Sequence, residues 1–358
     1  MNLAMKLALR ARGRTLPNPS VGALVVKDGR IIGRGYHKKA GLSHAEVIAL
    51  DEAGRKARGS SLYVTLEPCH HYGRTPPCVE AIIARGIRKV YIGIKDPNSL
   101  TNGKSISKLR NNGIEVEVGL LRAEIEESLE WFIKFQKTRL PFVVGKVAQT
   151  LDGKVATAQG ESKWITAAET RKFSHKERDA FDAILVGIDT VLADDPGLNG
   201  STKNKRLKKI IIDSTLRIPL SAKLFLNTKP QDCFVATTQA ASSKKVESLR
   251  RLGVNVLVST AIEGRVDLFG VFKQLGERGI SHVLIEGGAK ILGSALRGDL
   301  VDKMHFYFAG KILNDAKALS SINGGVCHRL AEAVSLSQLK FQPLGKDFLV
   351  TGYVHRNR

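Results

Sequence analysis

The feature that most constrains the fold is the alternation of short apolar runs with helical segments along almost the whole chain. In the first part we expect strands at 21–26, 31–36, 62–66, 90–94 and 114–118. Helices are expected at 3–11, 44–53, 78–84, 107–112 and 121–136. The first two strands flank a Lys-Asp-Gly turn, which predicts a hairpin. The alternation is typical of α/β domains, in which helices cover a sheet.

A short segment at 137–141, Lys-Thr-Arg-Leu-Pro, has the composition of a linker. Beyond it, helical patterns separate several of the expected strands, which are 142–148, 183–188, 209–213, 233–237, 254–258, 282–286 and 303–309. The chain has 358 residues, and a domain commonly holds about 150. We therefore expect two α/β domains, at 1–138 and 139–358, each able to bury its own core.

The chain is strongly basic, with 56 Lys and Arg against 34 Asp and Glu, a net charge of +22. Residues 1–138 contribute +10 and residues 139–358 contribute +12. An even division, with only 6% aromatic residues, argues against a basic arm or a stacking surface for nucleic acid. It favours small anionic ligands, phosphorylated ones among them. We expect no nucleic-acid partner, and the loop 201–209 is predicted to be a solvated basic surface.

The sequence predicts no membrane association. No apolar stretch reaches about 18 residues, so no spanning helix is expected. The start of the chain lacks the apolar core and cleavage site of a signal peptide. Four cysteines in a chain of this length do not make a disulfide framework, and two of them share one motif. These features predict a cytoplasmic protein with a metal site.

The metal-binding residues lie in the first half. His44 and Glu46 stand at an expected helix start, and Cys69 and Cys78 each follow a proline. One imidazole and two thiolates leave one position of a tetrahedral zinc open, as in catalytic zinc sites. Water there becomes a nucleophile near neutral pH, and Glu46 is placed to carry its proton. Residues i and i+2 diverge within a helix, so His44 and Glu46 must both lie in its first turn.

The alternative is a chance cluster of small buried thiols and a capping histidine. Zinc deaminases carry His-x-Glu followed by Pro-Cys-x-x-Cys. Here eight residues, not two, separate Cys69 from Cys78. The sequence therefore predicts a deaminase-type zinc site with an expanded loop.

That loop, residues 65–78, closely resembles the deaminase half of the bifunctional deaminase/reductase family of riboflavin biosynthesis. Further resemblances cover nearly the whole chain in the family's order, at 17–22, 35–37 and 96–98 in the deaminase half and at 150–154, 160–166, 187, 190–196, 285–288 and 301–302 in the reductase half. The resemblance implies an α/β protein with an N-terminal cytidine-deaminase-like α/β/α domain. It also implies a C-terminal dihydrofolate-reductase-like α/β domain.

The resemblance implies two consecutive reactions on a small phosphorylated pyrimidine. The first is the zinc-dependent hydrolytic deamination of 2,5-diamino-6-ribosylamino-4(3H)-pyrimidinone 5′-phosphate. The second is the NADPH-dependent reduction of the ribosyl group of 5-amino-6-(5-phosphoribosylamino)uracil to ribityl. By the family's motif, His44, Cys69 and Cys78 would hold zinc, and Glu46 would be the catalytic proton carrier. Substrate contacts in this half are implied for Asn18, His37, His71 and Arg74. A homo-oligomer is expected.

In the second half, a strand ending at Glu286 leads through Gly287-Gly288 into a helical stretch at 290–296. Glycines at a helix start can hold a phosphate, although a plain tight turn would have the same sequence. No Gly-x-Gly-x-x-Gly is present here, so a Rossmann site is not predicted. The resemblance implies cofactor contacts for Ala148, Trp164, Thr190, Asp194, Ser214, Gly288, Ala289, Lys290, Ile291, Leu292, Gly293 and Ser294. It implies substrate contacts for Ser162, Arg178, Leu198 and Glu286. No residue is identifiable that would recognise the 2′ position of the cofactor ribose.

The chain departs from the family's pattern twice in the reductase half. The family continues Asp-Asp-Pro-x-Leu with Thr-x-Arg, whose arginine helps to hold the substrate phosphate, but here Asn199-Gly200-Ser201 follows. Either Lys203 or Arg206 replaces that arginine or phosphate binding is weaker, and Ala309-Gly310 stands where Ala-Pro is common. Two alternatives therefore stand beside the bifunctional enzyme. One is a deaminase with an impaired reductase half, and the other is a zinc deaminase acting on a flipped base of nucleic acid.

Overall fold

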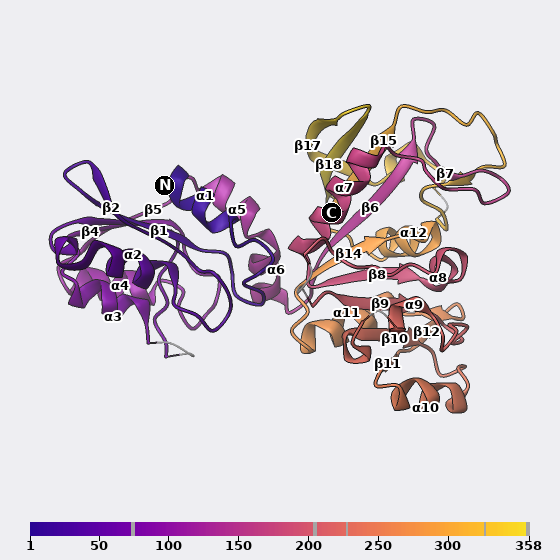
Figure 1. The fold of residues 1–358 in the computed structure, drawn as a ribbon, viewed down its shortest axis with the longest axis horizontal. Helices are drawn as coiled ribbons and strands as arrows, with labels where there is room; N and C mark the ends of the chain where they lie inside the picture. Colours follow the sequence, from indigo (N-terminus) through magenta and orange to yellow (C-terminus); the bar gives the residue numbers. More distant parts are fainter. Residues whose placement is uncertain (73–75, 203–205, 227, 326, 356–358) are drawn as a thin grey trace. The chain divides into compact units, whose positions relative to one another are not determined.

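The computed structural model describes residues 1–72, 76–202, 206–226, 228–325 and 327–355 (Figure 1). The chain divides into two compact units, Met1–Arg139 and Leu140–Arg358. Each unit has its own sheet and its own hydrophobic core.

The first unit is a sheet with helices on both faces. Among its described residues the main sheet has five strands, in the order β2-β1-β3-β4-β5. They are β1 (Gly22–Lys27), β2 (Arg30–Tyr36), β3 (Ser61–Leu66), β4 (Lys89–Ile94) and β5 (Glu115–Val118). β1 is antiparallel to β2 and β3, whereas β3, β4 and β5 are parallel. The predicted hairpin and the predicted strands of this half are present.

The helices of this unit are α1 (Asn2–Leu9), α2 (Ala45–Ala53), α3 (Cys78–Ala84), α4 (Lys104–Asn111), α5 (Arg122–Ser128) and α6 (Glu130–Thr138). α2, α3 and α4 pack on one face of the sheet, with Leu50 among their core residues. α1 packs on the other face against Leu24, and Ile125 of α5 lies against Gly93 of β4. These layers form the α/β/α fold that was expected. The single helix predicted at 121–136 is instead two helices, because the backbone leaves the helical region at Leu129.

Two glycines of β2 let α2 lie directly on the sheet. A Cβ added at Gly33 would lie 2.1 Å from the backbone oxygen of Ala49, and one at Gly35 would lie 2.0 Å from that of Ala45. The contacted atom at Gly35 is a backbone oxygen, which cannot move aside as a flexible side chain can. Gly35→Ala is therefore expected to displace the start of α2. We expect it to lower the free energy of unfolding by about 1–3 kcal/mol.

Chemical denaturation of the full chain would measure that loss, with bound zinc counted in the same samples. Gly29→Asn is the control, because a Cβ at Gly29 meets nothing within 4 Å and asparagine tolerates its φ of +73°. Equal stability of Gly35→Ala and the unaltered chain would contradict the close packing.

The second unit is built on a larger mixed sheet. In the described part of the unit this sheet has nine strands, in the order β11-β10-β9-β8-β14-β6-β15-β18-β17. Those from β11 to β15 in this order are parallel, and β18 and β17 are antiparallel additions. The strands are β6 (Phe142–Thr150), β8 (Ala183–Gly187), β9 (Lys208–Ile212), β10 (Cys233–Thr237), β11 (Asn255–Val258), β14 (His282–Glu286), β15 (Lys303–Ala309), β17 (Ser335–Leu344) and β18 (Asp347–His355). Two short pairs are β7 (Lys154–Ala156) with β16 (Leu319–Ser320), and β12 (Ala261–Ile262) with β13 (Arg265–Val266).

The helices of this unit are α7 (Ala168–Glu177), α8 (Ile188–Asp194), α9 (Lys223–Leu226), α10 (Ser243–Arg251), α11 (Leu268–Glu277) and α12 (Ala289–Arg297). Short 3-10 helices of the chain lie at Gly54–Ala57, Arg178–Ala180, Pro230–Asp232 and Leu330–Glu332. Phe272 of α11 and Leu292 of α12 join the core beneath the parallel strands. The carboxyl ends of these strands meet at one edge of the sheet, which is where parallel sheets bind ligands.

The expectations for the second unit omit two long strands and are wrong for one loop. The expected strands end at residue 309, whereas β17 and β18 follow it and form one end of the sheet. The side chains of β17 are mostly exposed, so its alternation is weak. The loop 201–209 is not solvated throughout, because β9 begins at Lys208 and Lys209 is buried.

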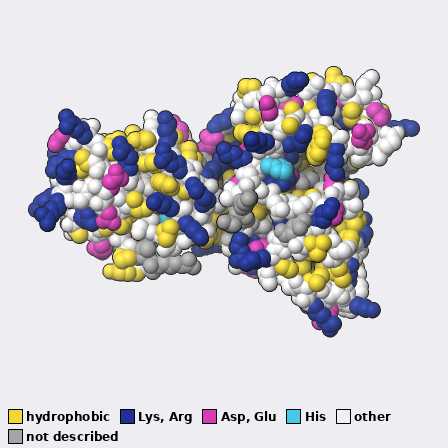
Figure 2. Space-filling view, viewed as in Figure 1, with side chains coloured by type: hydrophobic (Ala, Val, Ile, Leu, Met, Phe, Trp, Pro, Cys, Tyr) yellow, Lys and Arg dark blue, Asp and Glu magenta, His cyan; other side chains and the backbone are white. Residues whose placement is uncertain are grey.

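Within the described residues, no helix is long and apolar enough to cross a membrane. Figure 2 shows Lys and Arg side chains spread over the visible face of each unit, with acidic and apolar side chains between them. On that face the positive charge does not gather in one patch, in keeping with the even division of the net charge.

Candidate active sites

The first candidate site lies where α2 and α3 begin. His44 precedes α2 as its N-cap, Cys78 is the first residue of α3, and Cys69 follows β3. The His44 Nδ1 is 3.2 Å from the Cys78 Sγ and 3.5 Å from the Cys69 Sγ. All three ligand atoms lie within 4.8 Å of one another. A nitrogen and two sulfurs this close fit a zinc ion with one position left for a further ligand.

Glu46 lies in the first turn of α2, so the condition set by its spacing from His44 is met. Its side chain is buried, and burial, the largest effect, raises the pKa of Glu46 to about 7. Such a carboxyl can take up and release a proton near neutral pH. The hydrogen bond with Cys78 is the largest effect on Cys69 and lowers the pKa of its thiol. That shift favours the thiolate, the form that binds metals.

A buried acid that the sequence analysis did not single out fixes the loop carrying Cys69. Glu67 accepts hydrogen bonds from the backbone N–H groups of Asp96 at 3.1 Å and Gly103 at 3.0 Å. The loop after β3 is thereby tied to the segment after β4. The signal in the sequence is an acid directly before the Pro-Cys pair.

The structure describes three of the four substrate residues predicted for this unit. His37 is buried, and its ring centre is 5.2 Å from that of His44. Its Nε2 is 3.3 Å from the Asn18 Nδ2, and burial lowers the pKa of His37, which favours the neutral ring. His71 lies on the loop after β3. Arg74 lies outside the described residues.

The second candidate site is a cavity of about 820 Å³ in the second unit. Residues at the carboxyl ends of β6, β8, β9 and β14 line it. Most of the predicted cofactor residues are on its wall, namely Ala148, Thr190, Asp194, Ser214, Gly288, Ala289, Lys290, Ile291, Leu292 and Ser294. Of the predicted substrate residues, Ser162 and Glu286 line it.

Four predicted residues are not on the cavity wall, namely Trp164, Arg178, Leu198 and Gly293. Gly293 has a packing role, because a Cβ there would lie 1.9 Å from the backbone oxygen of Asn323. Leu198 is buried. Trp164 is 61% exposed, with the Arg171 guanidinium 4.2 Å from its ring centre.

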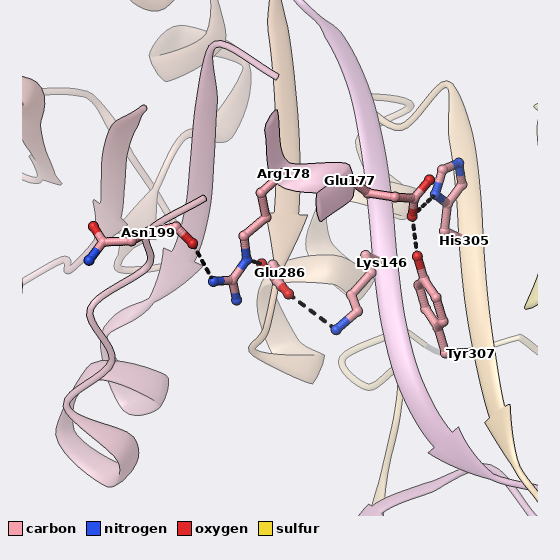
Figure 3. Close-up of polar contacts among 7 residues, drawn as sticks. All are labelled: Lys146, Glu177, Arg178, Asn199, Glu286, His305 and Tyr307. Atoms are coloured by element: carbon pink, nitrogen blue, oxygen red, sulfur yellow. Dashed lines mark hydrogen bonds and ion pairs between the residues drawn. The ribbon is translucent and has the colours of Figure 1, made fainter. Parts of the chain in front are cut away.

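Glu286 is held between two cations at the end of β14 (Figure 3). The Lys146 Nζ donates to it at 3.1 Å and the Arg178 Nε at 2.7 Å. The three side chains are at most 16% exposed. Burial alone would raise the pKa of Glu286, but the charges of Lys146 and Arg178 outweigh burial and lower it to about 2. At neutral pH Glu286 is therefore a carboxylate that orients its neighbours.

Lys146 is a residue of this site that the sequence analysis missed. It lies on β6 and lines the cavity, and its Nζ is 5.4 Å from the ring centre of Tyr307 on β15. The Tyr307 hydroxyl donates to Glu177, whose carboxylate is also 3.5 Å from the His305 Nδ1 (Figure 3). The sequence signal for Lys146 is its place inside the apolar run 142–148. A lysine there is expected to be buried, and a buried charge rarely lacks a partner.

The segment that departs from the family's pattern contacts the same cluster. The Arg178 Nη1 donates to the carbonyl of Asn199 at 2.8 Å. Arg206 pairs with Asp232 at 3.2 Å, and Lys203 lies outside the described residues. Of the two candidates for the absent arginine, Arg206 is therefore already paired with an acid of the second unit.

Both halves of the chain match known families. Residues 1–94 match the cytidine and deoxycytidylate deaminase zinc-binding region, and residues 141–350 match the RibD C-terminal domain. The riboflavin biosynthesis protein RibD of Aquifex aeolicus is 43% identical over 352 residues, which cover 98% of this chain and 96% of that protein. The chain belongs to the RibD family. RibD of Escherichia coli K12 is 37% identical over 97% of this chain and 96% of its own length.

Solved structures of RibD proteins share the fold. RibD of Acinetobacter baumannii has a TM-score of 0.88 at 36% identity, over 99% of this chain and 98% of that one. A Thermotoga maritima protein described as a diaminohydroxyphosphoribosylaminopyrimidine deaminase/5-amino-6-(5-phosphoribosylamino)uracil reductase has a TM-score of 0.84 at 36% identity. The match covers 99% of this chain and 97% of the Thermotoga maritima chain. The predicted fold class is confirmed.

Like its relatives, this chain is an enzyme with a zinc-binding deaminase domain and an NADPH-dependent reductase domain. Both predicted cofactors, zinc and NADPH, follow from these domains. The match over nearly the full length does not favour a deaminase with an impaired reductase half, nor a deaminase acting on nucleic acid.

Proposed function

We propose that the two units perform consecutive steps of riboflavin biosynthesis on one phosphorylated pyrimidine. Residues 1–138 deaminate 2,5-diamino-6-ribosylamino-4(3H)-pyrimidinone 5′-phosphate, and residues 139–358 reduce the ribosyl group of the product to ribityl. The observation that carries the proposal is that one chain holds both sites. The first unit has an open His-Cys-Cys site beside a buried acid. The second unit has a ligand-sized cavity beside a buried Lys-Glu-Arg cluster.

In the first unit we assign zinc to His44, Cys69 and Cys78, and proton transfer to Glu46. Zinc, when bound, makes water a nucleophile at neutral pH. The Glu46 carboxylate takes the proton of the attacking water and returns it to the leaving amino group. Ammonia then departs neutral, and the ring carbon keeps the oxygen. Substrate binding is assigned to Asn18, His37, His71 and Arg74.

In the second unit we assign substrate and cofactor to the shared cavity. NADPH, when bound, supplies the hydride. The ring-opened sugar presents an imine carbon to it, and the imine nitrogen must gain a proton. Glu286 is anionic and holds Lys146 in place, so we assign that proton to the Lys146 ammonium. We assign Ser162 and Glu286, with Arg178 bound to Glu286, to substrate, and Ala148, Thr190, Asp194, Ser214, residues 288–292 and Ser294 to NADPH. Trp164, Leu198 and Gly293 are not on the cavity wall, and their contacts stay predictions.

The test is a coupled assay on the purified, zinc-loaded chain. The diaminopyrimidinone ribosyl phosphate is supplied with and without NADPH, and ammonia release and NADPH oxidation are followed separately. Ammonia release in both samples, with NADPH oxidation following it, supports the proposal. Absence of ammonia overturns the first assignment, and ammonia without NADPH oxidation overturns the second.

Removal of zinc is expected to stop the first reaction only. A chelator removes the metal itself, and Cys78→Ser removes one of its thiolate ligands. Each change should therefore abolish ammonia release. NADPH oxidation with supplied deaminated product should continue, since its site is in the other unit. Metal content measured beside each rate checks the link.

The matched control for Cys78→Ser is Cys327→Ser. Cys327 is exposed and its Sγ donates to the Arg329 carbonyl at 3.1 Å. This variant should keep both zinc and ammonia release. Full ammonia release by metal-free protein would contradict the zinc assignment.

We also propose that the chain works as a homo-oligomer in the cytoplasm. In support, β17 ends its sheet, and its Leu339 and Phe341 are 48% and 70% exposed, a pattern suited to pairing with a second copy. Free cysteines in the described residues suit a reducing compartment. Light scattering in solution would test the assembly, and a monomer at micromolar concentration would contradict it.

A further inference from the structure

The cavity of the second unit extends well beyond the Lys146–Glu286 pair. Its wall includes Ser214 and Arg217 after β9, and Arg265 on β13. In the sheet, β8 and β14 lie between β9 and β6. At about 4.8 Å per strand, the end of β9 lies on the order of 14 Å from that of β6. The cavity therefore has a second end, far enough from the reacting groups for the distal part of a dinucleotide.

Hydrogen bonds fix the geometry of this second end. The Ser214 hydroxyl accepts from the backbone N–H of Val266 at 3.2 Å. The Ser214 carbonyl accepts from the hydroxyls of Thr237 at 3.0 Å and Thr238 at 2.9 Å. The β12–β13 hairpin, and with it Arg265, is thus attached to the segment that follows β9.

The charged lining residues of this end include Arg217, Arg265 and Asp189. Arg217 pairs with Asp189 at 2.7 Å. Arg265 is exposed, and its guanidinium has no ion-pair partner in the part of the chain that the structure describes. An arginine fork binds phosphate oxygens through two parallel hydrogen bonds. An unpaired acid at such a place would instead favour a ribose 2′-hydroxyl, but here Arg217 neutralises Asp189.

We propose that Arg265, together with Arg217, binds the 2′-phosphate of NADPH and so selects NADPH over NADH. The inference rests on the reductase site proposed above. NADPH differs from NADH only by its 2′-phosphate, and the proposal places this phosphate at the positively charged end of the cavity. The apolar residues Ile212, Val266 and Leu268 on the same wall provide a surface for the neighbouring base.

Equilibrium binding to the zinc-loaded full chain tests the proposal without requiring turnover. Arg265→Gln removes a charge-assisted hydrogen bond, so the Kd for NADPH should rise about ten- to a hundredfold, while the Kd for NADH should hardly change. The fragment 2′,5′-ADP, which carries the phosphate without the nicotinamide, should lose affinity in parallel with NADPH. Arg217→Gln should also weaken NADPH selectively, because it leaves the Asp189 carboxylate unpaired.

Arg250→Gln is the matched control, since Arg250 is an exposed arginine of α10 outside the cavity wall. Its NADPH affinity should equal that of the unaltered chain. If Arg265→Gln weakens NADPH and NADH equally, or changes neither, the proposal is overturned. If the unaltered chain binds neither dinucleotide, the reductase assignment itself fails, a result distinct from loss of selectivity alone.

Discussion

Replacement of Glu46 by glutamine is expected to lower the rate of ammonia release by about 10²- to 10⁴-fold, the usual contribution of a general acid–base group. Glutamine keeps the shape of the side chain but cannot take the proton of the attacking water. Glu46 is only 4% exposed, so a buffer base cannot reach the same position. The measurement is kcat for ammonia release by the zinc-loaded chain. NADPH oxidation with supplied deaminated product should be unchanged.

The control for this variant is Glu52→Gln on the same helix. Glu52 is exposed, and its Oε2 accepts from the backbone N–H of Arg34 at 2.9 Å. It should release ammonia normally. Zinc content must also stay full in Glu46→Gln. If this variant lost its zinc, the lower rate would show that Glu46 supports the metal site and would not test its role in proton transfer. Near-normal ammonia release by zinc-loaded Glu46→Gln would contradict its role.

The zinc site could be predicted because its geometry is encoded locally. His44 and Glu46 fall in one helix turn, and Cys78 begins the next helix of the same layer. Each ligand therefore stands at a boundary that the sequence marks with a proline or a helix start. The supporting Glu67 was not predicted, because its partners at 96 and 103 come from a loop whose path depends on the whole sheet.

The cluster of the second unit could not be predicted in the same way. Lys146 and Arg178 lie 140 and 108 residues before Glu286, and only the strand order brings them together. A buried Lys209, whose Nζ donates to the Asn199 Oδ1 at 2.8 Å, likewise resembles a surface charge in the sequence. Period and composition reveal which face of a strand is apolar. They do not reveal which distant strand supplies the partner of a buried charge.

Lys146→Gln is expected to lower NADPH oxidation by at least about a hundredfold when deaminated product is supplied. Glutamine is of similar length but has no acidic ammonium proton for the imine nitrogen. The Glu286 carboxylate keeps Arg178 at 2.7 Å, so it is not left as an unpaired buried charge and the unit should still fold. The Kd for NADPH should hardly change, because the loss falls on the chemical step. Single-turnover NADPH oxidation beside equilibrium binding would separate these quantities.

Lys303→Gln is the matched control for that variant. Lys303 lies on the neighbouring strand β15, and its Nζ is 4.5 Å from the ring centre of Tyr353, much as Lys146 lies over Tyr307. It does not line the cavity, so its removal tests the loss of a lysine–tyrosine contact without the loss of the proton source. If both variants slow reduction alike, Lys146 acts through packing. If only Lys146→Gln slows it, while ammonia release stays normal, the ammonium beside Glu286 serves the reduction itself.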